Sequence, residues 1–147
     1  MENDDTILLV EDNPDDAELT LEALRRNRIT VPVRVMKDGA EALDYLFGRG
    51  QFGGARLPPI PALVLLDLNL PKVPGLEVLR ALRADARTRL VPTVLLTTSV
   101  EDSDVLQGYS LGANAYVQKP VGFEDFVIAI GRLAQFWTAT NVGPPRR

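Results

Sequence analysis

The fold is best read from the stretch LVLLDLNLP, residues 63–71, which is the most apolar part of the chain. A single carboxylate, Asp67, interrupts it. A continuous run of large apolar residues is typical of a strand that is covered on both faces of a parallel sheet. A lone carboxylate is costly to bury in such a place. The sequence therefore predicts a strand at 62–67 that ends at Asp67, where the sheet meets water.

Short apolar runs alternate with helical patterns along the rest of the chain. Further strands are predicted at 6–10, 32–36, 92–97 and within 114–120. A helical pattern follows each strand, and the last helix is the clearest, since its apolar residues keep helical spacing from Phe123 to Trp137. Five strands that alternate with five helices predict an α/β fold with a doubly wound parallel sheet between two helical layers.

Two predicted helices begin with capping signals. Asn13 can cap the first helix, and Pro14 suits its first helical position. Asp15 and Asp16 suit the positive end of the helix dipole. Asp38 is predicted to cap the second helix.

The segment 48–61 interrupts this alternation, because its glycines and prolines do not fit a regular element. We predict a loop there. Residues 48–53, GRGQFG, match the G-x-G-x-x-G pattern of dinucleotide sites, but that motif needs a strand before it and a helix after it. A predicted helix precedes this match and prolines follow it, so the sequence does not favour a dinucleotide site.

Charged and hydroxyl side chains follow the predicted strands. In a parallel sheet the carboxyl ends of the strands share one edge, and ligands bind there. Five residues are expected to meet at this edge: Glu11, Asp12, Asp67, Thr97 and Lys119. Two carboxylates about 4 Å apart repel each other by about 4 kcal/mol at an effective dielectric constant of about 20. Such a group needs positive charge beside it.

A hard divalent cation and a fixed ammonium would supply that charge. Mg²⁺, or Mn²⁺ in its place, takes oxygen ligands and often bridges to phosphate. Lys119 supplies the ammonium, and Thr97 supplies a hydroxyl donor. These groups could surround a phosphoryl group on Asp67, since Asp is a known covalent phosphoryl acceptor.

Each of these residues also has a purely structural interpretation. Glu11 and Asp12 could be acids that only favour a helix start. Thr97 could be an ordinary strand residue, and Lys119 could be solvated. Tyr116 could be a core aromatic residue. The functional interpretation rests on the whole set at one predicted edge.

Motifs spread over nearly the whole chain make it similar to the receiver domains of two-component response regulators. The matching segments are LLVEDNPDD (8–16), LVLLDLNLPKVPG (63–75), VLLTTS (94–99) and GANAYVQKP (112–120). The resemblance implies a flavodoxin-like receiver fold with strand order 2-1-3-4-5 and five helices. The long 48–61 loop and the opening at 8–27 resemble the small single-domain regulators that pair with bacterial phytochromes.

The resemblance also assigns roles at the acidic end of the sheet. Asp67 would be the phosphoacceptor of a phosphorelay. Mg²⁺ would be bound by Glu11, Asp12 and Asp67, together with the backbone carbonyl of Asn69.

Further roles fall on the last two strands. Thr97 and Lys119 would contact the phosphoryl oxygens. Tyr116 would be an aromatic switch that turns inward when Thr97 moves. The Lys119–Pro120 peptide bond would be cis, which proline tolerates.

Composition excludes several classes of site. The chain has no cysteine and no histidine, so disulfides, thiolate sites, imidazole metal ligands and a Ser-His-Asp triad are excluded. A net charge of −4 argues against a nucleic-acid binder, and no apolar run approaches the roughly 20 residues of a membrane span. We expect a cytoplasmic protein with neither DNA nor membrane as a partner.

The resemblance implies that the phosphoryl donor is a sensor histidine kinase. The kinase would supply the donor histidine, because this chain has no histidine. Docking is expected on the first helix around Pro14, Ala17 and Leu21. We expect a receiver domain at 1–138 and a flexible tail at 139–147, without an output domain. The protein would then be a signalling module that catalyses only its own phosphorylation and dephosphorylation.

The last helix carries apolar residues outside its main stripe, namely Ile128, Ala129 and Phe136. Exposed apolar patches often mark interfaces. This pattern predicts a symmetric homodimer that uses the last helix.

Two other functions compete with the phosphoacceptor hypothesis. A phosphatase of the haloacid dehalogenase type would also use an Asp nucleophile and Mg²⁺, but it places a second acid where this chain has Asn69. A binding-only pseudo-receiver would be expected to lack the acidic pair, the acceptor or the lysine, and all of these are present.

Overall fold

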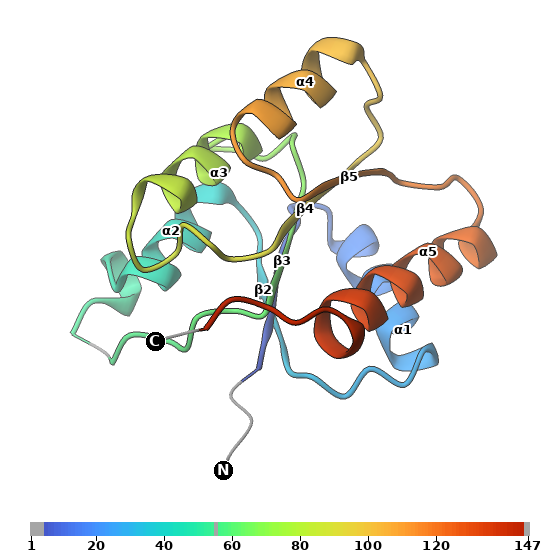
Figure 1. Cartoon of the computed structure of the whole chain (residues 1–147), viewed down its shortest axis with the longest axis horizontal. Helices are drawn as coiled ribbons and strands as arrows, with labels where there is room; N and C mark the ends of the chain where they lie inside the picture. Colours follow the sequence, from blue (N-terminus) through green and yellow to red (C-terminus); the bar gives the residue numbers. More distant parts are fainter. Residues whose placement is uncertain (1–4, 55, 146–147) are drawn as a thin grey trace.

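One parallel sheet runs through the middle of the protein (Figure 1). The structure, a computed structural model, describes residues 5–54 and 56–145. From one edge to the other the strands are β2 (Val33–Met36), β1 (Ile7–Val10), β3 (Leu63–Leu66), β4 (Thr93–Thr97) and β5 (Ala115–Gln118). All neighbouring pairs are parallel. The predicted fold class and strand order are confirmed.

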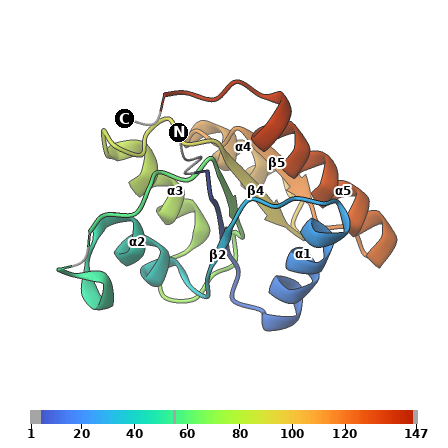
Figure 2. The same cartoon turned by 90° about the horizontal axis from the view of Figure 1, so that it is seen from below.

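Helices cover both faces of the sheet, as Figures 1 and 2 show. The helices are α1 (Pro14–Arg26), α2 (Gly39–Phe47), α3 (Gly75–Ala84), α4 (Asp102–Ser110) and α5 (Phe123–Gln135). Successive side chains of β1 point to opposite faces of the sheet. Ile7 and Leu9 pack in the core under α1 and α5. Leu8 and Val10 pack in the core under α2 and α3. β3 is fully buried on both faces, as its apolar run predicts.

The predicted caps fix the starts of α1 and α2. The Asn13 side chain accepts hydrogen bonds from the backbone N–H groups of Asp15 and Asp16, at 2.9 and 3.1 Å. The Asp38 side chain accepts from the Glu41 N–H at 2.7 Å. Because both caps directly follow strands, they place the first turns of α1 and α2 at the carboxyl edge of the sheet.

The 48–61 segment is largely irregular, although it contains one 3₁₀ turn, Gly50–Phe52. The guanidinium of Arg87 donates to the carbonyl of Pro58 in this segment and to the carbonyl of Leu46 in α2, just before it. The G-x-G-x-x-G match follows α2 and enters this short turn. The strand-then-helix context of a dinucleotide site is therefore missing around the match.

The last helix is longer than predicted. α5 continues as a π-helical turn from Phe136 to Thr140, and the Thr138 hydroxyl donates to the Ala134 carbonyl at 2.5 Å. The helix thus crosses the predicted domain boundary at residue 138. Residues 146 and 147 of the predicted tail lie outside the described residues, and the flexibility of the tail stays a prediction.

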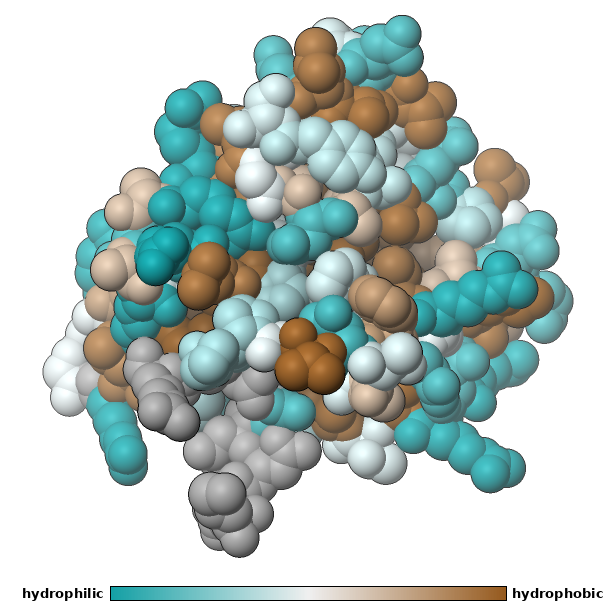
Figure 3. All heavy atoms as spheres, in the orientation of Figure 1, coloured by the Kyte–Doolittle hydropathy of each residue, from teal (hydrophilic) through white to brown (hydrophobic). Residues whose placement is uncertain are grey.

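α4 covers the sheet loosely. Gly108 is its buried residue, whereas Leu106 and Tyr109 are 68% and 50% exposed. Figure 3 shows apolar side chains gathered at the top of the view, over α4. Among the described residues, no helix combines the length and apolar character that crossing a bilayer requires.

Candidate functional site

Asp67 lies directly after β3, at the carboxyl edge of the sheet, and is buried. Its backbone N–H donates to the Val10 carbonyl at 3.2 Å, so the end of β3 stays paired with β1. One carboxylate oxygen, Oδ1, accepts from the Asn69 N–H at 3.0 Å. The strand end and this turn fix the orientation of the carboxylate.

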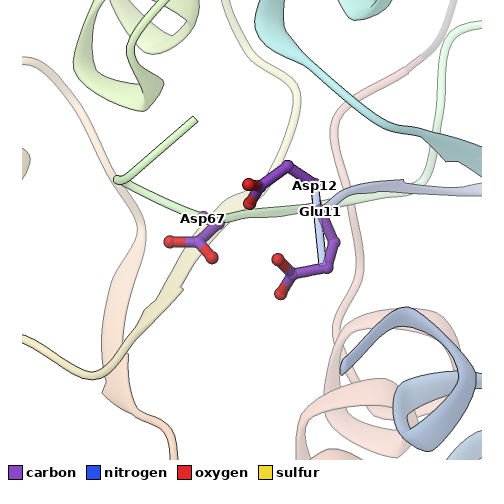
Figure 4. Close-up of side chains that lie close together, drawn as sticks. All are labelled: Glu11, Asp12 and Asp67. Carbon is purple, nitrogen blue, oxygen red and sulfur yellow. The ribbon is translucent and has the colours of Figure 1, made fainter. Parts of the chain in front are cut away.

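Three carboxylates converge at this edge, as predicted. One oxygen from each of Glu11, Asp12 and Asp67 lies within 4.8 Å of the other two. Figure 4 shows the three side chains gathered from the ends of β1 and β3. Glu11 and Asp67 are buried, whereas Asp12 is exposed. This all-oxygen set, open to solvent on one side, fits a hard divalent cation that retains water ligands.

Lys119 lies against the same carboxylates. Its backbone N–H donates to the Thr97 carbonyl at 2.7 Å, which places the residue just past the paired ends of β4 and β5. Its ammonium Nζ donates to Glu11 Oε1 at 2.5 Å and to Asp67 Oδ2 at 3.1 Å. A third bond, at 3.2 Å, reaches Asp16 Oδ2 on the first turn of α1. The Lys119 side chain is 10% exposed, so these contacts are largely screened from water.

Burial and charge shift the pKa values of this group. Burial raises the pKa of Glu11 to about 7, and repulsion from Asp67 adds to the rise, although the hydrogen bond from Lys119 opposes it. Burial lowers the pKa of Lys119, but the bond to Glu11 and the charges of Asp67 and Glu11 outweigh that effect and leave the pKa raised. Lys119 therefore stays an ammonium at neutral pH, while Glu11 holds its proton more tightly than an ordinary glutamate.

The affinity of this carboxylate group for a divalent cation such as Mg²⁺ is expected to rise with pH up to about pH 7, because a cation that binds Glu11 would have to displace its proton. Release of one proton changes the apparent affinity by up to about tenfold per pH unit. Isothermal titration calorimetry from about pH 5.5 to about pH 8.5 measures this dependence. Glu11→Gln is the control, with a flatter dependence expected, and an equal slope in both proteins would contradict the assignment.

The same pKa shift has a consequence for stability without metal. The folded pKa of Glu11 lies above its ordinary value of 4.5, so the folded state binds more protons than the unfolded state between pH 4.5 and about pH 7. The contribution of Glu11 to the free energy of unfolding therefore falls as pH rises through this window.

Thr97 and Tyr116 both make hydrogen bonds with Ser99. Thr97 is buried at the end of β4, and its hydroxyl oxygen accepts from the Ser99 N–H at 3.4 Å. The half-buried Tyr116 hydroxyl donates to the Ser99 carbonyl at 2.9 Å. Among the described residues, no hydrogen bond joins Thr97 to Asp67. The structure thus connects the predicted switch residues through Ser99.

The predicted cis bond before Pro120 is wrong, because all peptide bonds of the described residues are trans. Before proline the trans peptide bond is still favoured, by about 0.5–1 kcal/mol. A proline therefore permits a cis bond but does not require one.

Ala17 does not suit the predicted docking surface on α1. Its side chain is buried and packs in the core with Leu9 and Leu24. The stripe that fixes α1 to the sheet includes this position, so Ala17 faces inward. Pro14 is exposed and Leu21 is half-buried, and these two residues remain on the surface.

The residues predicted for a dimer contact differ in exposure. Ile128 and Phe136 are 49% and 46% exposed, whereas Ala129 is half-buried. Ile128 and Phe136 both line a shallow groove along α5 that also includes Gly131. The structure thus places two of the three side chains on one accessible surface.

Sequence reasoning missed two contacts at this edge. Asp16 was assigned only to the helix dipole, yet it bonds Lys119. Lys72, which has a left-handed φ of 65°, lies 3.5 Å from the buried Asp38 carboxylate. Both contacts join segments that are distant in sequence, and no local pattern marks either of them.

Comparison with known proteins matches residues 7–131 to the response regulator receiver domain family. The chain belongs to this family. The response regulator Rcp1 of Synechocystis sp. is 36% identical over 138 residues, which is 94% of this chain and 92% of Rcp1.

Solved structures agree with this placement. The phosphorylated cyanobacterial phytochrome response regulator RcpA has a TM-score of 0.86 at 35% identity, and the Mn²⁺-bound form of Rcp1 has a TM-score of 0.86 at 34% identity. In both comparisons 96% of this chain and 99% of the other are covered. The bacteriophytochrome response regulator RtBRR is 53% identical, with a TM-score of 0.76 over 97% of this chain and 85% of RtBRR. Each of these relatives is a response regulator by name.

Proposed function

We propose that this receiver accepts a phosphoryl group on Asp67 in a Mg²⁺-dependent reaction and signals as a stand-alone regulator. The observation that carries the proposal is the convergence of Glu11, Asp12 and Lys119 on the Asp67 carboxylate. The phosphorylated state of RcpA and the Mn²⁺-bound form of Rcp1 support it by similarity.

The chain's own groups are suited to this chemistry. An Asp67 carboxylate oxygen would form the new bond to phosphorus in line with the leaving group. The donor's bond to phosphorus breaks at the same time and releases acetate from acetyl phosphate, or the imidazole nitrogen from a phosphohistidine. A bound Mg²⁺ would be held by Glu11, Asp12, Asp67 and the Asn69 carbonyl, and it would supply positive charge that neutralises the phosphoryl oxygens. Lys119, already within 3.1 Å of Asp67, donates a hydrogen bond to a phosphoryl oxygen.

The signal would pass through Ser99. A movement of the Thr97 hydroxyl toward the phosphoryl group would lengthen its 3.4 Å hydrogen bond from the Ser99 N–H. That movement disturbs the residue whose carbonyl accepts the Tyr116 hydroxyl. Phosphorylation would thus bias the orientation of Tyr116 and the loosely packed surface of α4 beside it.

Acetyl phosphate with Mg²⁺ tests the proposal directly. Intact mass spectrometry is expected to show one added phosphoryl group, which is lost when the metal is chelated. A known receiver run in parallel confirms that the donor is active. If the control is labelled and this protein is not, the protein is a binding-only receiver and the proposal fails.

The phosphatase alternative has a separate readout in the same experiment. A phosphatase would turn over p-nitrophenyl phosphate repeatedly with Mg²⁺, whereas a receiver would retain a single phosphoryl group. Asn69 at the position of the second acid supports the receiver.

We infer that the donor is a sensor histidine kinase, a bacteriophytochrome by similarity to RtBRR and RcpA. The exposed Pro14 and the half-buried Leu21 offer a docking surface on α1. We also infer a cytoplasmic location, with neither DNA nor membrane as a partner, in keeping with the net charge of −4.

A homodimer through α5 is expected, because Ile128 and Phe136 expose apolar surface along one groove. Light scattering coupled to size exclusion should show a dimer for the wild type and a monomer for Ile128→Glu and for Phe136→Glu. Leu106→Glu on α4, where the wild-type side chain is 68% exposed, is the matched control and should stay dimeric. An unchanged state in both α5 variants would remove α5 from the interface.

A further inference from the structure

We propose that Asp16 is a positioning residue, which holds the Lys119 ammonium in place for phosphoryl transfer to Asp67. The inference rests on the proposed function and adds a residue to its machinery. The observation behind it is the third hydrogen bond of Lys119, from Nζ to Asp16 Oδ2 at 3.2 Å.

The Lys119 ammonium has all of its hydrogen-bonding capacity in use. A lysine ammonium has three N–H donors, and Nζ has three carboxylate partners: Glu11, Asp16 and Asp67. Three acceptors from three different elements fix the position of a flexible side chain that is only 10% exposed.

Asp16 differs from the other two acceptors because it lies outside the group of carboxylates that could hold a metal ion. Glu11 and Asp67 belong to that group, so metal ligation draws on the same carboxylates that hold Lys119. When Asp67 becomes an acyl phosphate, the N–H that faces its Oδ2 must turn to a phosphoryl oxygen. Of the three acceptors, Asp16 alone can keep its hydrogen bond to Lys119 both when a metal binds and when Asp67 is phosphorylated.

The backbone of Asp16 is suited to this anchoring role. Its N–H donates to the Asn13 cap at 3.1 Å, and its carbonyl accepts from the buried Thr20 hydroxyl at 2.8 Å. Both bonds lie within α1 and its cap, and they fix the backbone of the first turn of the helix. The carboxylate itself is 39% exposed, so water can replace it without a large cost to the fold.

The test compares Asp16→Ala with Asp15→Ala. Asp15 is the matched control, since it has the same charge on the same helical turn and makes no hydrogen bond with Lys119 among the described residues. At saturating Mg²⁺, Asp16→Ala should be phosphorylated by acetyl phosphate about fivefold more slowly than the control. The Mg²⁺ concentration for half-maximal rate should be the same in both, because Asp16 is not a metal ligand.

Asp16→Asn supplies the rescue, because its amide oxygen can accept the same hydrogen bond without the charge. Its rate should lie between those of Asp16→Ala and the wild type. A purely structural role for Asp16 would lower the free energy of unfolding without this graded effect on rate. Equal rates for Asp16→Ala and Asp15→Ala would overturn the proposal.

An NMR measurement separates this proposal from the proposed function. Slow exchange of the Lys119 ammonium protons, detected through ¹⁵N at Nζ in the unphosphorylated protein, is expected in the wild type and in Asp15→Ala. It should be lost in Asp16→Ala, where one N–H faces water, and retention of the signal would overturn the positioning role. Absence of phosphorylation in the wild type would instead defeat the proposed function, whatever the exchange rate of Lys119.

Discussion

Asp67→Asn is expected to take up no phosphoryl group from acetyl phosphate, while the wild type takes up one. An amide oxygen is not a nucleophile that forms an acyl phosphate, and the substitution preserves the size of the side chain. Intact mass after incubation with Mg²⁺ measures the difference. Asp15→Asn is the matched control, because it removes one exposed carboxylate at the same edge of the sheet and should be labelled like the wild type.

The same variant has an independent signature at Glu11. Repulsion from Asp67 contributes to the raised pKa of Glu11, so Asp67→Asn should bring that pKa down toward the ordinary value. Titration of the Glu11 side-chain carbon by NMR measures the change. If Asp67→Asn still takes up a phosphoryl group, the acceptor is Asp12 or Glu11 and not Asp67. If the pKa of Glu11 is unchanged in this variant, the carboxylates of Glu11 and Asp67 are not coupled.

The location of the acidic site could be predicted because it follows from strand order alone. Carboxyl ends of parallel strands share one edge, so Glu11, Asp12 and Asp67 meet there whatever the helices do. The ends of β1 and β3 are marked in the sequence by an acidic residue directly after an apolar run. The structure confirms that these three carboxylates meet.

Contacts between helices and strand ends could not be predicted in this way. The bond between Asp16 and Lys119 joins residues 103 positions apart, and it depends on where the first turn of α1 lies beside the end of β5. The same limit applies to Ala17, whose burial depends on the rotation of α1 against the sheet. Periodicity gives the apolar stripe of a helix but leaves the exposure of residues at its border open.

Gly75→Ala is expected to destabilise the protein by about 1–3 kcal/mol or more, because the added methyl group has no space. A Cβ atom at Gly75 would lie 2.1 Å from the Asp67 carbonyl oxygen and 2.7 Å from the Leu68 Cα. Both are backbone atoms, so a side-chain rotation cannot relieve the overlap. Urea unfolding followed by circular dichroism measures the loss relative to the wild type.

Gly143→Ala is the control, since a Cβ atom there would meet no heavy atom within 4 Å. Its free energy of unfolding should stay within about 0.5 kcal/mol of the wild type. Equal stability of the two variants would mean that the turn between β3 and α3 can open without cost.

The effect of Gly75→Ala should extend to the site itself. The Gly75 N–H donates to the Leu68 carbonyl at 3.0 Å, so the first residue of α3 is bonded to the turn that carries Asp67. Relief of the overlap must therefore move α3 away or shift the Asp67 backbone, which also changes the position of the carboxylate. Binding of Mg²⁺ measured by calorimetry should weaken in this variant even where it is still folded. Unchanged Mg²⁺ affinity in a destabilised Gly75→Ala would show that α3 moves and Asp67 does not.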